Sequence, residues 1–313
     1  MTLATAAAAL ETRLGDRVER DAPAGPLTTY RCGGPVAVLV RIDRADDLEA
    51  VAEVLVGEPA TPVVVIGRGS NLLIADSGFA GVALVLGGEH ERIEFDPVGA
   101  RVEAGGAAAL PVLARQAAKA GIGGLEFYVG IPGSVGGAVR MNAGGHGAQT
   151  KDVVEWARVL DLRDGETRQL SVAELDLGYR HSVLGPRQVV VAASFVGHET
   201  DPAVGEAQID EIVRWRRVHQ PGGQNAGSVF TNPPGDTAGR LIESSGLKGL
   251  RVGGVVVSDK HANFFVAEPG ARANDVLALV QLVQARVEGA TGIRLEPELQ
   301  LVGFAEGSEE GSR

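Results

Sequence analysis

The sequence predicts an α+β fold arranged in three domains. Strand-like and helix-like stretches alternate unevenly, and several neighbouring strands are spaced as hairpins, which disfavours a doubly wound parallel sheet. With 313 residues, of which 44% are hydrophobic and 22% charged, the chain can bury a substantial core in two or three domains without disulfides. We place the domains at 1–88, 89–200 and 201–304, followed by a disordered tail at 305–313.

The first domain, residues 1–88, is expected to combine two helices with four strands. Apolar residues at i, i+3, i+4 and i+7 predict a helix over 44–56, with Asp43 as its N-cap. An Ala-rich helix precedes it and ends at Gly15. Branched apolar runs predict strands at 36–42, 62–66, 71–74 and 82–86.

The second domain, residues 89–200, is expected to contain a hairpin. Residues 153–162 and 166–171 flank Arg163-Asp164-Gly165, in which the Asp-Gly pair is typical of a tight primed turn. Ser171 and Glu174 have the spacing of a capping box for a short helical turn. The other expected elements are strands at 92–96, 101–106 and 189–197, a helix at 110–120, a long Gly/Pro loop at 121–148 and a polar linker at 198–206.

The third domain, residues 201–304, contains the clearest helix pattern of the chain. Over 274–289 five apolar residues share one helical face. A second helix at 237–245 is expected to begin at a cap on Asp236 and to end at Gly246. The remaining elements are a helix at 207–218 and strands at 228–230, 251–257, 263–267 and 293–303.

Charge and composition exclude several classes of protein. The formal net charge of −11 argues against a nucleic-acid or anionic-membrane binder, but it leaves room for a local basic pocket. A single Cys, Cys32, rules out an internal disulfide framework and fits a reducing compartment. No apolar run is long enough to span a membrane, and the N-terminus lacks a basic region, so we expect a cytoplasmic protein. The six His residues show no metal-ligand spacing, so no metal is expected.

Glycine is unusually abundant, at 44 residues, and clustered. Residues 67–71 (GRGSN) follow an apolar strand, and their backbone N–H groups could cradle a phosphate, although a simple turn explains them equally well. Leu72 stands where the third Gly of a dinucleotide-binding fingerprint would lie. Residues 130–138 (GIPGSVGGA) hold four further glycines in the first eight positions, and we favour contact with a planar ligand or a diphosphate over an irregular loop.

Eight motifs in order resemble one known family. They are TTYRCGGP (28–35), VIGRGSNLL (65–73), GIPGSVGGAVRMNAGGHG (130–147), GYRHS (178–182), NAGSVFTNP (225–233), SGLKGLRVGG (245–254), SDKHANFF (258–265) and LEPEL (295–299). Together they resemble the UDP-N-acetylenolpyruvoylglucosamine reductase family, in its shorter architectural type, over about residues 27–303. The resemblance implies a two-part FAD-binding region of the vanillyl-alcohol-oxidase type and a smaller α+β substrate-binding domain.

The resemblance also implies a reaction. NADPH reduces FAD, and the flavin N5 delivers a hydride to C3 of the enolpyruvyl group of UDP-N-acetylglucosamine enolpyruvate. A proton then reaches C2 and gives UDP-N-acetylmuramate, in cytoplasmic peptidoglycan precursor synthesis. The expected partners are therefore these small molecules, with no nucleic acid and no membrane insertion, and we expect a monomer.

Residue by residue, the family motifs give roles to three side chains. Arg180 matches the Arg that stabilises the substrate carboxylate as its charge grows, Ser228 the proton donor to C2, and Glu298 the acid that stabilises the enolate. Glu298 would have to be protonated to donate a hydrogen bond, which requires burial or a nearby anion. Glu296 is the competing assignment and ranks second.

The expected ligand contacts are more numerous. The FAD contacts implied by the resemblance are Gly67, Arg68, Gly69, Ser70, Asn71, Leu72, Ala104, Gly105, Pro132, Gly133, Ser134, Gly137 and Ala138. Those for the UDP-sugar are Tyr179, Asn232, Arg240, Lys248 and His261.

The chain departs from the family at His146, where Tyr is common, at Cys32, and at 217–221, which lacks a Lys often found there. Two other hypotheses are a related flavin oxidase of the same fold and a nucleotide-sugar binder without flavin.

Overall fold

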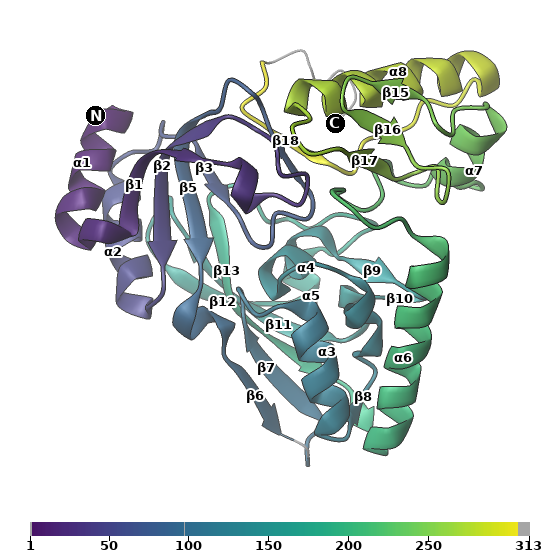
Figure 1. Cartoon of the computed structure of the whole chain (residues 1–313). Helices are drawn as coiled ribbons and strands as arrows, with labels where there is room; N and C mark the ends of the chain where they lie inside the picture. The colour runs from purple at the N-terminus through teal and green to yellow at the C-terminus, as the bar shows by residue number, and fades with distance from the viewer. Residues whose placement is uncertain (1, 97, 306–313) are drawn as a thin grey trace. The chain divides into compact units, whose positions relative to one another are not determined.

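The computed structural model describes residues 2–96 and 98–305 (Figure 1). All but the first residue of the predicted disordered tail, 305–313, lies outside the described residues. The chain divides into two compact units. The first comprises Met1–Arg20, Val38–Arg68 and Gly81–Arg216, and the second comprises Asp21–Ala37, Gly69–Ala80 and Arg217–Arg313. Helices and strands mix in both units, so the predicted α+β class is confirmed.

The first unit holds most of a four-stranded sheet in the order β1–β2–β5–β3, in which β3 and β5 run parallel. Helices α1 and α2 pack side by side next to it, as Figure 1 shows. The bounds are α1 Leu3–Leu14, α2 Ala45–Val56, β1 Val18–Pro23, β2 Pro35–Ile42, β3 Val63–Val65 and β5 Phe79–Leu86. The predicted Asp43 cap of α2 is wrong. The Asp47 carboxylate instead accepts the N–H groups of Asp43 and Arg44 at 3.2 and 2.9 Å.

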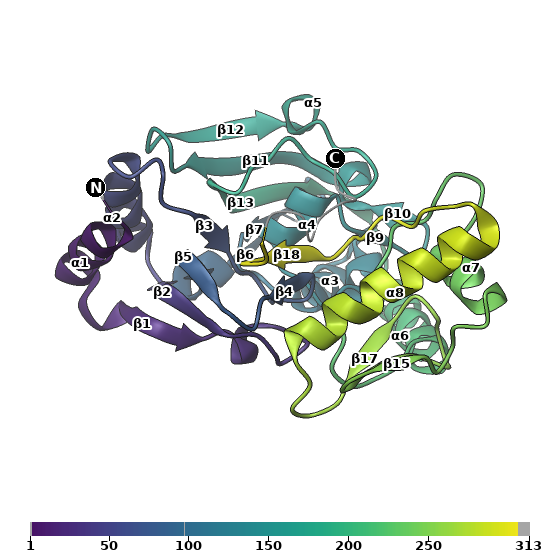
Figure 2. The same ribbon diagram turned by 90° about the horizontal axis from the view of Figure 1, so that it is seen from above.

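A five-stranded antiparallel sheet, in the order β12–β11–β13–β7–β6, forms the rest of the first unit (Figure 2). Buried residues of α3, α4 and α6 join those of its strands in one hydrophobic core around Tyr128 and Phe195. The bounds are β6 Ile93–Asp96, β7 Arg101–Gly105, β11 Val154–Asp161, β12 Thr167–Ser171, β13 Gln188–Val196, α3 Leu110–Lys119, α4 Val135–Met141, α5 Val172–Leu175 and α6 Pro202–His219.

The β11–β12 hairpin and the Ser171–Glu174 capping box are confirmed, but the predicted turn is wrong. Asp161 N–H donates to Glu166 O at 2.9 Å, and Gly165 N–H donates to Asp161 O at 2.8 Å. These bonds enclose a four-residue loop in place of a two-residue primed turn. An Asp-Gly pair therefore marked the place of the turn but not its type.

Two predicted irregular segments contain regular structure. Within 121–148 lie helix α4 and the short strands β8 Ile122–Gly123, β9 Gly144–Gly145 and β10 Ala148–Gln149. Ser134 caps α4 through a hydrogen bond from Gly137 N–H, and glycines inside the helix masked its pattern. Within the predicted linker 198–206, β14 spans His198–Glu199 and α6 already begins at Pro202, a residue suited to a first helical turn.

In the second unit, helix α8 packs on the small antiparallel sheet β15–β16–β17 (Figure 2). The parallel pair β18–β4 and helix α7 complete it, around one hydrophobic core. The bounds are β4 Leu72–Ile74, α7 Ala238–Ser244, β15 Arg251–Val252, β16 Val255–Val257, β17 Phe265–Ala267, α8 Ala273–Thr291 and β18 Gln300–Val302. The helix predicted at 274–289 is thus confirmed as part of α8.

Four predictions for this unit are corrected. Residues 228–230 make only isolated bridges, and the strand predicted at 293–303 is regular only over β18. The strand predicted at 251–257 is interrupted where Gly253 turns with φ of +51°. Thr237, not Asp236, caps α7 by accepting the Arg240 N–H at 3.3 Å.

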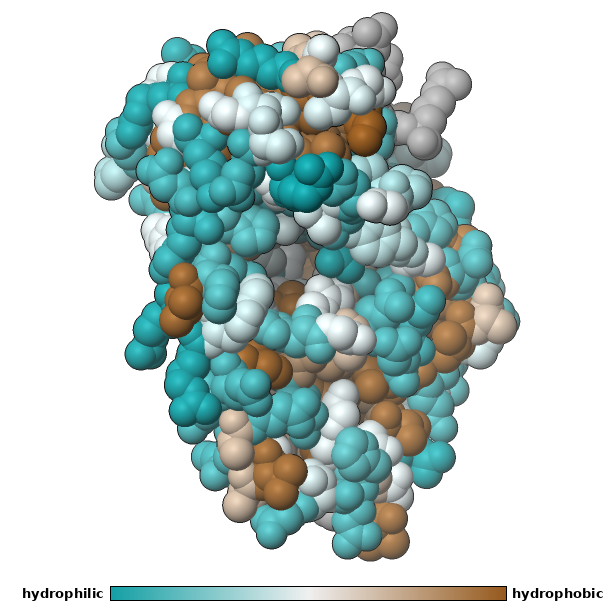
Figure 3. All heavy atoms as spheres, turned by 90° about the vertical axis from the view of Figure 1, so that its right-hand side faces the viewer, coloured by the Kyte–Doolittle hydropathy of each residue, from teal (hydrophilic) through white to brown (hydrophobic). Residues whose placement is uncertain are grey.

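One face of the molecule is mainly polar. On the face shown in Figure 3, hydrophobic residues are scattered among hydrophilic ones. No helix within 2–96 and 98–305 is both long and apolar enough to cross a bilayer.

Candidate functional site

The first glycine loop, residues 67–71, is shaped by close backbone approaches. A Cβ on Gly67 would lie 2.4 Å from Ser134 Oγ within the first unit. Gly69, in the second unit, has φ of +62°, and a Cβ there would lie 1.9 Å from Leu27 O. Thr29 holds the same loop, because its N–H donates to Gly69 O at 3.1 Å. Gly69 is therefore required by sterics and by conformation, whereas at Gly67 the close neighbour is a side-chain hydroxyl.

The loop also fits a phosphate. Among the described residues, the peptide N–H groups of Gly69, Ser70 and Asn71 donate no hydrogen bond to the protein. Gly69 is nevertheless buried. Consecutive N–H groups next to a residue of positive φ form a concave anion site, and buried donors need an acceptor. These three residues are thus suited to hold the pyrophosphate of FAD.

The second glycine loop, 130–138, uses its amides differently. Gly136 N–H donates to Gly106 O at 2.8 Å, and Val135 N–H donates to Ala108 O at 2.9 Å. The N–H groups of Gly137 and Ala138 bond to Ser134. Because these donors are satisfied within the first unit, this loop offers flat surface for a planar ligand rather than N–H groups for a diphosphate.

The other expected FAD contacts differ in exposure. Gly67, Arg68 and Pro132 are exposed, whereas Ala104 and Ala138 are covered by the core of the first unit at 0% and 1% exposure. Gly105 packs so closely on His90 that a Cβ would lie 2.1 Å from His90 O. Gly133, Ser70, Asn71 and Leu72 are half-buried.

Arg180 lies in a two-residue turn of the first unit. Gly178 and His181 exchange backbone hydrogen bonds at 3.1 and 3.3 Å, which leaves Tyr179 and Arg180 at the tip. Arg180 has φ of +54°, a strained conformation for a non-Gly residue. Its guanidinium donates to Gly144 O at 3.2 Å and lies 5.1 Å from the Tyr179 ring centroid.

A buried Asn fixes this turn from behind. Asn142 has no exposed surface, and its Nδ2 donates to Gly178 O at 2.7 Å and to Gln149 Oε1 at 3.0 Å. Its Oδ1 accepts the Lys151 N–H at 2.9 Å. A strained turn clamped by a fully bonded side chain is the kind of feature that concentrates at functional sites.

Ser228 and Glu298 are brought together within the second unit. The residue after Ser228 is bonded to Glu298, because Glu298 N–H donates to Val229 O at 2.8 Å. Asn71 Nδ2 donates to Glu298 O at 3.1 Å, so a residue of the 67–71 loop holds the same segment. Glu298 is half-buried, whereas Glu296 is exposed.

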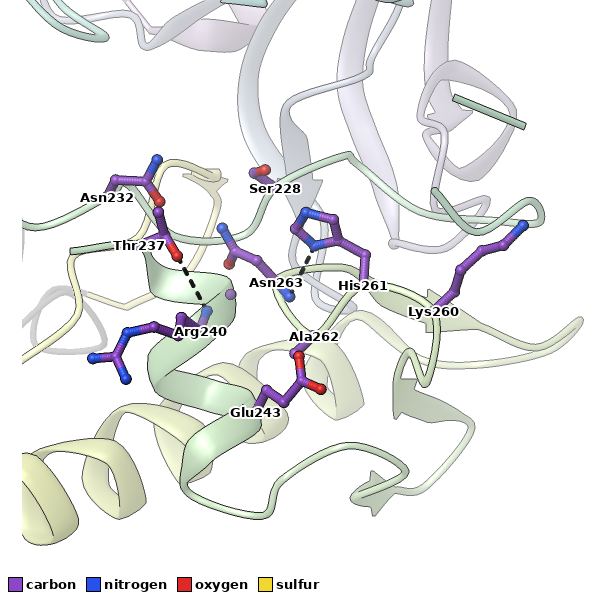
Figure 4. Close-up of a pocket in the computed structure, with 10 residues that line it drawn as sticks. Ser228, Asn232, Thr237, Arg240, Glu243, Lys260, His261, Ala262 and Asn263 are labelled. Atoms are coloured by element: carbon purple, nitrogen blue, oxygen red, sulfur yellow. Dashed lines mark hydrogen bonds between the residues drawn. The ribbon is translucent and has the colours of Figure 1, made fainter. Parts of the chain in front are cut away.

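Ser228 opens onto a cavity of about 380 Å³ in the second unit (Figure 4). Of the residues expected to bind the UDP-sugar, Asn232, Arg240 and His261 line it too. Tyr179 belongs to the first unit and does not. The lining also includes residues that the sequence did not single out, namely Thr237, Gly239, Glu243, Lys260, Ala262 and Asn263.

The charges around this cavity are largely paired. Arg240 forms an ion pair with Asp236, and Lys248 Nζ lies 2.7 Å from Glu243 Oε1. Burial, and secondarily the charge of Lys248, lower the pKa of His261, so its ring is neutral at neutral pH. Lys260 donates to Arg217 O at 2.7 Å, and its side chain extends away from the other side chains in Figure 4. An anionic ligand would bind here by exchanging with the carboxylate partners.

Some of the missed residues had a signal in the sequence. Lys260, Ala262 and Asn263 lie in the SDKHANFF motif, from which only His261 was chosen. Thr237 follows Asp236 at a predicted helix start. Glu243 had none. Among the described residues no cluster of His, Cys, Asp and Glu could hold a metal ion.

Comparison with known proteins gives matches along most of the chain. Residues 218–302 match the family model for the C-terminal domain of UDP-N-acetylenolpyruvoylglucosamine reductase, and residues 36–171 match that for an FAD binding domain. UDP-N-acetylenolpyruvoylglucosamine reductase 2 of Symbiobacterium thermophilum is 44% identical over 92% of both chains. The reductase of Rubrobacter xylanophilus is 41% identical over 93% of this chain and 97% of its own.

A solved structure is similar over the same extent. The crystal structure of UDP-N-acetylenolpyruvylglucosamine reductase from Thermus caldophilus superposes with a TM-score of 0.78 at 38% identity. The match covers 91% of this chain and 99% of that one. The two agree in sequence and in fold from near one end of the chain to near the other.

Proposed function

The chain belongs to the UDP-N-acetylenolpyruvoylglucosamine reductase family, and on that premise we propose that it reduces UDP-N-acetylglucosamine enolpyruvate to UDP-N-acetylmuramate at the expense of NADPH. Its FAD binding domain identifies FAD as the cofactor. The observation that carries the proposal is the placement of Ser228 on a cavity edged by Arg240, with Glu298 bonded to the next residue. The resemblance further implies a monomer that acts in cytoplasmic peptidoglycan precursor synthesis.

The chain's residues divide the work of holding FAD. Gly69, Ser70 and Asn71 would bind the pyrophosphate with their free N–H groups. The 130–138 loop would lie against the ring system, because its glycines present little side chain. Bound FAD supplies the hydride that is added to C3 of the substrate.

Arg180, Ser228 and Glu298 would each act on a different atom of the substrate. When C3 gains a hydride, negative charge moves through C2 into the carboxylate, and the guanidinium of Arg180 pairs with that growing charge. Ser228 Oγ gives its proton to C2, so hydride and proton together saturate the double bond. Glu298, in its protonated form, donates a hydrogen bond to the enolate oxygen.

Anaerobic visible spectroscopy of the purified holoprotein tests this function. NADPH should bleach the flavin band, and the UDP-enolpyruvyl sugar should then restore it without oxygen. The two half-reactions are thereby observed separately. If the sugar does not reoxidise the reduced flavin but oxygen does so rapidly, the chain is instead a flavin oxidase.

A further inference from the structure

Asn263 is a buried polar residue whose amide oxygen and amide nitrogen both bond to the backbone. It is 3% exposed although it lines the cavity next to Ser228. Its Nδ2 donates to Phe230 O at 2.8 Å, and its Oδ1 accepts the Phe230 N–H at 3.0 Å. The amide thus imitates one rung of a β-ladder, with donor and acceptor both facing the backbone of a single residue.

The backbone of Asn263 holds the same segment. Val229 N–H donates to Asn263 O at 2.9 Å, and Ser228 forms an antiparallel bridge with Phe264. Asn263 therefore makes three hydrogen bonds to the two residues that follow Ser228. On the other side, Val229 O accepts the Glu298 N–H at 2.8 Å, so this segment connects the serine to the glutamate.

Asn263 itself rests on a rigid loop. The N–H groups of Lys260 and His261 both donate to Ser258 Oγ, at 3.1 and 3.3 Å, and Ser258 is buried. Ser258 N–H donates to Phe264 O at 2.9 Å and closes the loop. The loop is thus fixed by its own hydrogen bonds before any ligand binds.

We propose that Asn263 is a positioning residue that sets the place of Ser228, and through Val229 that of Glu298, for protonation of the substrate. The inference rests on the proposed function. Because both polar ends of the amide are bonded to Phe230, the backbone next to Ser228 fixes the orientation of the Asn263 side chain, and the residue acts through the serine. Proton transfer needs the donor within hydrogen-bond reach, and a displacement of about 1 Å costs on the order of 100-fold in rate.

The variant Asn263→Asp tests this with little change in volume. The ionised carboxylate still accepts the Phe230 N–H, but its second oxygen faces Phe230 O and repels it. Protonation restores a donor at that position. Burial raises the pKa of an introduced carboxyl, so the repair should occur within a practical pH range.

We expect a pH-dependent defect confined to one half-reaction. At pH 8 reoxidation of the flavin by the UDP-enolpyruvyl sugar should be about 10-fold to 100-fold slower than in wild type, and the ratio should approach one as the pH falls. Reduction by NADPH should stay unchanged. His261, Lys260, Arg240 and Glu243 line the same cavity, so the wild-type profile serves as the reference for their titration.

A second measurement and a matched control separate positioning from general damage. In the protein without substrate, the Phe230 N–H should exchange with solvent deuterium faster in Asn263→Asp at pH 8 than at low pH, relative to wild type. Gln284→Leu removes another buried amide of the same unit, whose Nε2 donates to Leu295 O at 2.8 Å. It should lower Tm without any pH-dependent loss of reoxidation.

The inference is overturned if Asn263→Asp slows both half-reactions equally, if it acts only on the Kd of the sugar, or if Gln284→Leu reproduces its pH profile. Unaltered exchange of the Phe230 N–H overturns it as well. Failure of the proposed function has a different signature, because wild type would then not be reoxidised by the sugar at all.

Discussion

The turn that carries Arg180 and the segment that carries Ser228 are held in opposite ways. Arg180 lies at the tip of a two-residue turn with φ of +54°, so its direction depends on a strained conformation. Ser228 precedes an extended segment that is bonded to distant parts of the sequence. Phe230 bonds to Asn263, 33 positions away, and Thr231 bonds to Glu296, 65 positions away. The conformation of a strained turn is determined by its own backbone angles, whereas that of an extended segment is determined by hydrogen bonds to neighbouring segments.

This difference teaches where each group is vulnerable. The strain at Arg180 costs on the order of 1–3 kcal/mol, which the bonds of buried Asn142 help to offset. Ser228 carries no such strain, but its segment loses its position if the hydrogen bonds on one side of it are broken. The arginine turn should therefore fail through loss of stability, and the serine segment through loss of alignment.

The largest expected effect comes from Ser228→Ala. Removal of the proton donor should slow reoxidation by the UDP-enolpyruvyl sugar about 10²-fold to 10⁴-fold, as loss of a general acid does, with reduction by NADPH unchanged. Stopped-flow absorbance of each half-reaction measures both rates. Ser245→Ala, which removes a hydroxyl bonded to Leu241 O at 2.8 Å, is the control in the same unit. Equal slowing of both half-reactions would rule out the proton-donor role.

Asn142→Ala tests the strained side of the comparison. It leaves the Lys151 N–H without its side-chain partner and Gly178 O with only the His181 N–H, at about 1–3 kcal/mol for a group that stays buried and unsatisfied. Urea unfolding should show this loss. Reoxidation should also slow, and the effect should not add to that of Arg180→Ala, because both act on one group.

The matched variant is Asn225→Ala, since the side-chain hydrogen bonds described for Asn225 all lie within residues 222–227. It should change stability by no more than about 0.5 kcal/mol. If Asn142→Ala and Arg180→Ala slow reoxidation additively, the clamp does not act through the arginine.

The sequence was most informative where periodicity decides the structure. Helix α8 and strand β13 follow from their apolar patterns. Helix α4 did not, because Gly136 and Gly137 lower its intrinsic helicity, although Gly136 packs so closely on Gly106 that a Cβ would lie 3.1 Å from its carbonyl oxygen, which favours glycine there. Tertiary contact overrode propensity there.

The site was predictable only in part for a related reason. Arg180, Ser228 and Glu298 were chosen by resemblance to family motifs, and their roles stay predictions. The two asparagines that clamp them make bonds across 33 and 36 residues, and no local pattern reports such a bond. Whether an Asn is a surface turn residue or a buried clamp depends on the partner that folding brings to it.

The smallest expected effect concerns Asp236, at the rim of the cavity on the serine side. Its carboxylate accepts Arg240 Nε at 2.6 Å and the Thr237 N–H at 2.7 Å, and these bonds lower its pKa to about 2. A carboxyl whose pKa is lower folded than unfolded stabilises the fold above its unfolded pKa of about 4 and loses that contribution as the pH falls toward 2. Asp236→Asn should therefore flatten the stability profile between pH 4 and pH 2 slightly, as measured by urea midpoints.

At neutral pH the same substitution releases Arg240 from its ion pair, so UDP should bind somewhat more tightly, as measured by calorimetry. Weaker binding would show that the pair orients Arg240 toward the ligand, and the serine side would then depend on a local clamp as the arginine side does.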